Sequence, residues 1–485
     1  MPLRAQSFLE ARGADAPIAR IPRANRLAGE SAIVERALLW GFIAGLAWCP
    51  LWFGGSALSA WGINAILFCG LAAIYELSLL IRGERHAVAI WQIKAPAALF
   101  GAVLLWILFQ NATWTPNWLH HPIWQMAADA LDQPIDGSIS VDRERTSLAL
   151  LRLITAASVF WIALQLCRSA ARANFLLLST AVITCAYAAY GLATFGLTRN
   201  DGSVNSTFIN PDSFATYAGI GLITFFGLIL RLYRNEFAAV GGSVRFRIGR
   251  LIEVTGQKGV ALLGGAFVVL VALLLSGSRG GIAATGLSLF VLMALTVSLR
   301  KREFAEQRGT VIVVIVVGML LVAATFVIFG DIVVGKIAQA GFGDETRMAM
   351  YTIVMRSILN IPVLGYGYGT FADVFPMFRD QSMGTFDKLD FAHNTYLEVL
   401  QGLGLIFGSM LLASVSVMVW RCVKGVATRQ VNETVPAVAA SAAVVLGVHS
   451  LVDFSLQIQA IAISFMALLG AGVAQSESSR VLLGD

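Results

Sequence analysis

Charged residues are scarce in this chain of 485 residues. They make up 13% of it, whereas hydrophobic types make up 57%. Because a soluble globular protein carries about 25% charged residues, this composition excludes a water-soluble enzyme, including one held by a single membrane anchor. Lysine and arginine exceed aspartate and glutamate, 35 against 29. That surplus follows membrane topology, as described below, so no nucleic-acid partner is predicted.

Several motifs that carry chemistry in other proteins are missing. Phosphate-loop, dinucleotide and zinc-protease motifs are absent, which argues against an energy-coupled pump and an intramembrane metalloprotease. No Cys or His spacing suits a metal, so neither a metal site nor a cofactor is expected. The cysteines lie within apolar runs or at a cytoplasmic boundary, so a disulfide framework is not indicated. They are Cys49, Cys69, Cys167, Cys185 and Cys422.

Long apolar runs are what the chain has instead. About twelve runs have roughly the 17 to 25 residues that a helix needs to cross a membrane. An all-α polytopic membrane protein with about twelve transmembrane helices is therefore the predicted fold class. The predicted spans are 37–54, 58–81, 96–111, 148–167, 174–194, 213–230, 259–275, 281–298, 310–329, 395–420, 434–450 and 459–474.

The distribution of Lys and Arg orients these spans. Most of the 35 cations fall in alternate loops and in the two terminal segments, and cations are retained on the cytoplasmic side. Both termini are thus expected in the cytoplasm, and the first 30 residues lack the apolar core of a signal peptide. The predicted organisation is a cytoplasmic tail, transmembrane helices 1–9, a large periplasmic loop with short helices, transmembrane helices 10–12 and a second cytoplasmic tail. These parts cover 1–36, 37–329, 330–394, 395–474 and 475–485.

The outward segments are very unequal in length. The loop 330–394 has roughly 65 residues, and a loop of that length in a compact protein is usually functional. The segment 112–147 contains Trp114, Trp118 and Trp124. Because tryptophan favours the headgroup zone, an interfacial segment is predicted there. Simple packing or anchoring is the plainer explanation.

The hairpin 276–281 is the first of four polar candidates at outer span ends. It holds Ser278 and Arg279 among glycines. Glycine lets the backbone approach a ligand closely, and arginine presents a planar fork suited to phosphate. An outward arginine also runs against the cation bias, although it could simply snorkel to the interface.

Arg347, at the beginning of a predicted helix over 348–360, is the second candidate. Arg347 and Arg356 are nine residues apart and point to opposite faces of a helix, so at most one can serve a given site. Arg347 shares its stripe with Tyr351 and is preferred. Arg356 is expected to face lipid headgroups or solvent.

The third candidate is the entry to the span 395–420, and the fourth is the segment 206–212. A histidine at a helix amino end, such as His393, stays neutral near pH 7 and can act as a base. His393 or Asn394 could instead simply cap the helix. Glu398 lies within the span, where an ionisable residue is functional by default. In the fourth candidate, 206–212, Asn210 is a residue type that commonly forms turns and caps helices. Outside these four candidates, His449 could pair with Asp453.

These candidates together suggest one site at the outer leaflet of the membrane that the chain spans. The site would contain two cations and one base. Two arginines without an acidic pair for Mg²⁺ suit a pyrophosphate leaving group held by organic cations, which lowers the barrier to transfer. A histidine base typically adds about 10²- to 10⁴-fold. The implied reaction is group transfer from a lipid diphosphate to a hydroxyl. Because no nucleotide is available outside, the donor would be the lipid-linked sugar itself.

Four motifs, in order and spacing, resemble the bacterial O-antigen ligase and O-antigen or exopolysaccharide polymerase superfamily. They are GSRGG at 277–281, the run from ETR at 345–347 to PVLGYGYGTF at 362–371, HNTYL at 393–397 with GLGLIFG at 402–408, and STFINPDSFA at 206–215. The family often has Asn at the position of Asp212. The resemblance covers about 200–420 and includes all four polar candidates.

The resemblance implies a metal-independent, inverting glycosyltransferase similar to the GT-C-type membrane enzymes. Its donor would be an undecaprenyl-diphosphate-linked oligosaccharide at the periplasmic face of the bacterial inner membrane. Arg279 and Arg347 would bind the donor diphosphate, and His393 would be the general base for the acceptor hydroxyl. The supporting substrate-binding residues would be Ser278, Asn394, Glu398 and Asn210.

Two acceptors remain open. A polymerase passes the chain to a new lipid-linked repeat, whereas a ligase passes finished glycan to a lipid A core. The tail 449–459 resembles exopolysaccharide-type polymerases, so polymerisation is preferred, with a flippase and a chain-length regulator as possible partners. The rival hypotheses are a lipid-linked sugar transporter or flippase, which commonly shows internal repeats absent here, and a structural partner in polysaccharide export.

Overall fold

The computed structural model describes residues 23–198, 202–237, 244–298, 345–381, 383, 389–429 and 433–476. Regular structure in these ranges is helical, and no strand occurs in them. The predicted span 310–329 and residues 330–344 of the predicted large loop lie outside the described residues. The tails 1–22 and 477–485 do so as well.

The first half of the described chain contains nine α-helices and four short 3₁₀-helices. The α-helices are α1 (Arg23–Trp48), α2 (Leu58–Arg82), α3 (Lys94–Asn111), α4 (Ile123–Leu131), α5 (Arg143–Leu166), α6 (Ala170–Thr198), α7 (Pro211–Phe237), α8 (Val244–Leu275) and α9 (Arg279–Ser298). The 3₁₀-helices are η1 (Cys49–Leu51), η2 (Phe53–Gly55), η3 (Ile90–Ile93) and η4 (Asn117–Leu119).

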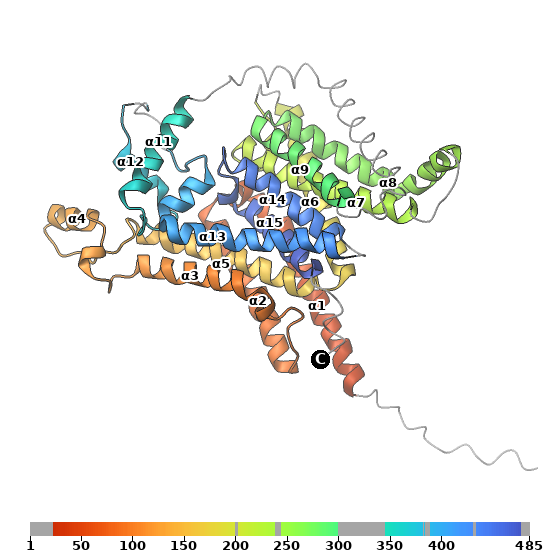
Figure 1. Ribbon diagram of the computed structural model, residues 1–485, viewed down its shortest axis with the longest axis horizontal. Helices are drawn as coiled ribbons and strands as arrows, with labels where there is room; N and C mark the ends of the chain where they lie inside the picture. The colour runs from red at the N-terminus through yellow and green to blue at the C-terminus, as the bar shows by residue number, and fades with distance from the viewer. Residues whose placement is uncertain are drawn as a thin grey trace, which may run out of the picture.

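The second half contains short helices within the predicted large loop, followed by the last predicted spans. They are α11 (Glu345–Asn360), α12 (Phe371–Phe378), α13 (Thr395–Thr428), α14 (Thr434–His449), η5 (Ser455–Gln457) and α15 (Gln459–Ser476). In Figure 1, α11 and α12 lie together beyond one end of α13, and α3 packs against both α13 and α5.

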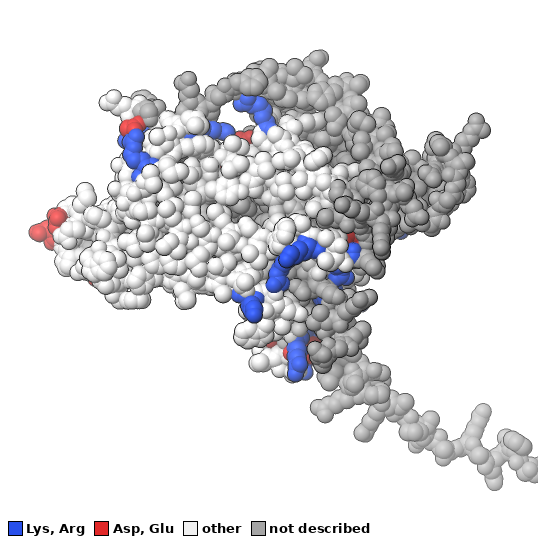
Figure 2. Space-filling view, in the orientation of Figure 1, with Lys and Arg blue, Asp and Glu red and all other residues white. Residues whose placement is uncertain are grey.

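Ten of these helices are long and apolar enough to cross a membrane, and α14 is a shorter apolar helix. Each overlaps a predicted span, because a lipid-spanning helix must be about 20 apolar residues long wherever it occurs. Charged side chains are sparse across the middle of the face in Figure 2. The prediction of an all-α polytopic membrane protein is confirmed.

Two helices form the interior of the bundle. The apolar stretches of α7 and α15 are 94% and 83% buried. α15 packs along α5, α13 and α14, and α7 packs along α6, α8, α9 and α14. Small residues allow this closeness: a Cβ on Gly470 of α15 would lie 2.5 Å from the carbonyl oxygen of Phe160.

Helix α13 is broken at Gly404, whose φ of 76° and ψ of 168° are not helical. A break inside a membrane helix frees backbone groups that must be satisfied within the protein. The backbone segment 361–369 supplies partners, since the N–H groups of Tyr366 and Gly367 donate to the carbonyls of Gln401 and Gly402. The glycine-rich motifs at 362–371 and 402–408 are therefore two sides of one backbone interface. The hydrogen bonds across this interface hold the part of α13 that precedes Gly404.

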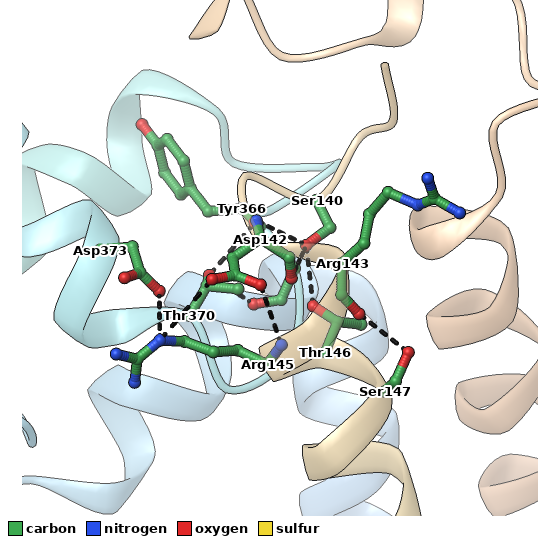
Figure 3. A network of polar contacts seen from close by, with 10 residues as sticks. Ser140, Asp142, Arg143, Arg145, Thr146, Ser147, Tyr366, Thr370 and Asp373 are labelled. Carbon is green, nitrogen blue, oxygen red and sulfur yellow. Dashed lines mark hydrogen bonds and ion pairs between the residues drawn. The ribbon is translucent and has the colours of Figure 1, made fainter. Parts of the chain in front are cut away.

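A polar network joins the same segment to the amino end of α5 (Figure 3). Arg145 Nε pairs with Asp373 at 2.9 Å, and its backbone N–H donates to the side chain of Asp142 at 2.9 Å. A Cβ on Gly367 would lie 2.2 Å from the Ser140 hydroxyl. The segments 112–142 and 361–378 therefore form one assembly.

The predicted interfacial segment contains both packed and exposed tryptophans. The indole of Trp124 donates to the carbonyl of Ser140 at 2.9 Å, so this side chain packs within the assembly. Trp114 and Trp118 are 76% and 82% exposed. They are the residues on which the predicted role at the membrane interface now depends.

Candidate functional site

The turn 450–458, between α14 and α15, is the point at which the predicted site segments meet. Its carbonyl groups accept hydrogen bonds from two other segments, the amino end of α13 and helix α11. The donors are the Thr395 N–H to Ser450 at 2.9 Å, the Asn394 amide to Leu451 at 3.0 Å, Arg347 Nη1 to Val452 at 3.3 Å and the Thr395 hydroxyl to Asp453 at 3.3 Å. One short turn thus fixes the relative positions of α11 and α13.

Arg347 and Tyr351 lie one turn apart on α11 and both reach this turn. The Tyr351 hydroxyl lies 2.9 Å from the carbonyl oxygen of His393 and 3.3 Å from that of Leu451. Arg356 points elsewhere and forms an exposed ion pair with Asp380 at 3.1 Å. The two arginines of α11 therefore lie on opposite faces, as the helical spacing predicts.

His393 occupies the residue before the amino cap of α13. Its φ of 47° is left-handed, a conformation that is uncommon for a residue with a side chain. Its imidazole meets the Phe454 ring edge-on at 4.8 Å, and Phe454 also stacks with Phe391 at 4.5 Å. Aromatic packing from the turn 450–458 thus orients the predicted base.

Three of the predicted supporting residues are helix caps. The Asn394 Oδ1 accepts from the Leu397 N–H at 3.1 Å, and the Ser278 hydroxyl accepts from the Gly281 N–H at 3.1 Å. Asn210 accepts from the Asp212 N–H at 2.8 Å. Capping satisfies the free N–H groups of a helix amino end, so it accounts for all three without a ligand.

Arg279 is the first residue of α9 and is exposed. Its guanidinium forms no hydrogen bond or ion pair within the described ranges. The next residue, Gly280, packs closely on the shared turn. A Cβ there would lie 2.8 Å from His449 Cδ2 and 3.2 Å from Val452 Cγ2. The arginine hairpin of α9 and Arg347 of α11 therefore both border the segment around Val452.

A buried chain of hydrogen bonds, absent from the predicted site, runs beneath this turn. Thr216 Oγ1 lies 2.6 Å from His449 Nδ1 and 2.7 Å from the Ser455 hydroxyl, which donates to Asp453. His449 and Asp453 are thus linked through two hydroxyl groups, whereas the sequence suggested a direct pair. If His449 carries its proton on Nδ1, every donor in the chain points toward the Asp453 carboxylate.

The Asp453 carboxyl is almost completely buried, with 1% of its surface exposed. The pKa of this carboxyl is raised to about 6: burial is the largest cause and the nearby Asp212 also raises it, whereas the hydrogen bond from Ser455 and electrostatic attraction to His393 act in the opposite direction. An acid titrating in this range beside the predicted base is typical of functional sites. The only sequence signal for it was the pairing suggested with His449.

No cluster of three or more His, Cys, Asp or Glu side chains suitable for a metal ion occurs among the described residues. Arginines from α9 and α11 border the part of the turn around Val452. Chemically, the arrangement offers two guanidinium groups for an anion and one imidazole backed by a buried carboxyl.

Residues 264–413 match the sequence model of the family described as O-antigen ligase. This match supports the O-antigen ligase and polymerase superfamily for that part of the chain. The match includes Arg279, Arg347 and His393, so the resemblance found in the sequence motifs is confirmed. It implies glycosyl transfer with a lipid-linked glycan donor and a glycan acceptor in a membrane. A comparison with curated proteins found no match.

Proposed function

We propose that this protein transfers glycan from an undecaprenyl-diphosphate carrier to an acceptor hydroxyl at the periplasmic face of the bacterial inner membrane. The observation that carries the proposal is the convergence of three family segments on the turn 450–458. Arg347 donates to Val452, the Arg279 hairpin packs on the same residue, and His393 packs on Phe454. Both termini would be cytoplasmic.

The two arginines would bind the donor diphosphate. Arg279 is exposed at the amino end of α9, where helix N–H groups also favour an anion. The Arg347 contact to Val452 is long, at 3.3 Å, and a diphosphate oxygen would be a stronger, charge-assisted acceptor. As the glycosidic bond breaks, negative charge grows on the leaving diphosphate, and guanidinium groups already in place stabilise it without a metal ion.

His393 would remove the proton from the acceptor hydroxyl. The acceptor oxygen then forms the new bond to the anomeric carbon from the face opposite the diphosphate, which leaves with the electron pair, so the configuration inverts. The resulting imidazolium would be stabilised by Asp453, which already interacts electrostatically with His393. The proton is lost to solvent, and the product is a glycan extended by one linkage.

Polymerisation of O-antigen or exopolysaccharide repeats is the preferred form of this reaction, because the turn 450–458 lies in the tail that resembles polymerases. A flippase and a chain-length regulator would then be partners. Ligation of finished glycan to lipid A core is the second candidate, favoured by the description of the matching family.

The test compares glycan profiles of cells lacking the gene and complemented at equal protein level by wild type, His393→Ala, Arg279→Ala or Arg356→Ala. Wild type and the Arg356→Ala control should restore normal chains, and the other two should not. Single repeats accumulating in the two inactive variants would identify a polymerase, and full-length chains left on the carrier a ligase. Normal profiles from both His393→Ala and Arg279→Ala would refute transfer and favour transport or scaffolding.

A further inference from the structure

A second polar cluster lies beside the candidate site, within the outer part of the helix bundle. Arg152 of α5 donates to the backbone carbonyl of Gln457 in η5 and lies over the Trp61 ring, 4.4 Å from its centroid. Electrostatic interactions connect Arg152 with Glu398 of α13 and with Tyr368. The cluster joins three helices and the segment 361–369.

Glu398 connects this cluster to the predicted base. Its Oε2 accepts a hydrogen bond from the backbone N–H of Ala392 at 3.1 Å, and the Gln457 side chain also bonds to its carboxylate. Gln457 in turn accepts from the Thr395 hydroxyl at 3.0 Å. The residues on both sides of His393 and Asn394 are therefore held by one pair of side chains.

The conformation that needs support is the backbone of His393. Its φ of 47° lies in a region that is unfavourable for a residue with a side chain and persists only when neighbouring contacts impose it. Glu398 fixes the N–H of Ala392, which belongs to the Phe391–Ala392 peptide, and Tyr351 fixes the carbonyl of His393. The two-residue unit Ala392–His393 lies between these two contacts. Both ends of the strained unit are thus held.

Stability alone gives little reason for such a cluster. Ionisable groups are expensive in a membrane protein interior, and a buried ion pair can often be replaced by apolar residues without loss of stability. Since the contacts of the Glu398 carboxylate are with Ala392, Gln457 and Arg152, it has an internal role. This differs from the substrate contact that the sequence suggested.

We infer that Glu398, held in place by Arg152 and Gln457, is a positioning residue that fixes the left-handed backbone of His393 and thereby aims its imidazole at the acceptor hydroxyl. This inference rests on the proposed function, in which His393 is the base. It assigns Glu398 an effect on the rate of the chemical step and none on donor binding.

The test measures kcat and donor KM for the purified full-length protein in lipid vesicles, with undecaprenyl-diphosphate-linked oligosaccharide as donor. Glu398→Ala removes the acceptor for the Ala392 N–H, so kcat should fall by about 10²-fold, as expected for a misplaced catalytic group, with donor KM unchanged. Glu398→Gln keeps an oxygen that can accept this bond. It should lose less than about tenfold, the value of one ordinary hydrogen bond.

Two controls separate positioning from general damage. Ser414→Ala removes a buried hydrogen bond in the same helix, from Ser414 to the carbonyl of Pro96 at 2.9 Å, and should leave kcat unchanged. In Arg152→Met, Glu398 is left as an uncompensated buried charge, so kcat should fall. The double variant Arg152→Met with Glu398→Gln should recover part of this loss, because the charge is gone and the acceptor remains.

Three results would overturn the inference. One is wild-type kcat in Glu398→Ala, and another is a raised donor KM with unchanged kcat, which would indicate direct contact with the donor. The third is equal loss in the Gln and Ala variants, which would show that the charge matters and the acceptor does not. Wild-type activity in His393→Ala would overturn the proposed function as well, whereas an inactive His393→Ala with a fully active Glu398→Ala would overturn positioning alone.

Discussion

The imidazole of His393 meets the ring of Phe454 edge-on, with 4.8 Å between the ring centroids. Edge-to-face contact suits the charge distribution of aromatic rings. It brings together a loop that precedes α13 and a turn that precedes α15, and Phe391 stacks on the same ring at 4.5 Å. The orientation of the predicted base therefore depends on apolar packing as well as on backbone contacts.

Replacing Phe454 with leucine should slow glycan transfer while the protein stays folded. Leucine keeps much of the apolar volume but removes two ring contacts, each worth about 0.5 to 1.5 kcal/mol. A loss of this size in orienting His393 corresponds to roughly a tenfold lower kcat. Phe42→Leu is the matched control, because Phe42 is buried and pairs with Phe68 at 5.9 Å in the packing of α1 against α2. Equal kcat values for the two variants would contradict the prediction.

Arg347 and Arg356 offer a direct comparison on one helix. Arg347→Ala should reduce transfer by about 10²-fold or more, the usual cost of losing one donor to developing charge. Arg356→Ala removes only an exposed pair with Asp380, worth about 0 to 1 kcal/mol, and should leave the glycan profile normal. Gel analysis of glycan length at equal protein level measures both. A normal profile from Arg347→Ala would place the diphosphate elsewhere.

The spans could be predicted from sequence because one physical constraint, the thickness of the hydrocarbon layer, fixes their length and composition. Helical periodicity alone also separated Arg347 from Arg356. The hairpin of Arg279 was selected because an arginine at a span end predicted to face outward is unusual. In each case the sequence pattern that supports the prediction lies close in the chain to the residue or span predicted.

The remainder of the site depends on contacts between distant segments. Thr216 looks like an ordinary helix threonine until His449 and Ser455 are placed beside it. Arg152 was treated as part of the apolar span 148–167 and not as a site residue, because its partner Gln457 is distant in the sequence. Gly404 looked like one more small residue, and only the backbone of 361–369 shows that it is a break.

Gly404→Ala should destabilise the protein strongly. A side chain at a φ of 76° and a ψ of 168° enters a region that is essentially restricted to glycine and costs about 1 to 3 kcal/mol. The added Cβ would also lie 2.2 Å from the carbonyl oxygen of Val363. We expect a lower melting temperature in detergent and a reduced yield of monodisperse protein. Gly286→Ala in α9, where no atom lies within 4 Å of the added Cβ, should be neutral or slightly stabilising. Identical behaviour of the two variants would argue against the break in α13.

Asp453 should make folding stability depend on pH in a defined direction. Burial raises the pKa of its carboxyl to about 6 in the folded protein, whereas the unfolded chain has a value of about 4. Between these values the folded state binds more protons, so the free energy of unfolding falls as pH rises, by at most roughly 3 kcal/mol from this group.

Asp453→Asn removes this titration and retains an oxygen that can accept from Ser455. The difference in melting temperature between variant and wild type, measured in detergent from pH 4 to pH 7.5, should therefore grow in favour of the variant as pH rises toward about 6 and then level off. Other titrating groups cancel in that difference. A difference that is constant across the range would mean that the Asp453 carboxyl is already ionised at low pH and that its pKa is not raised by burial.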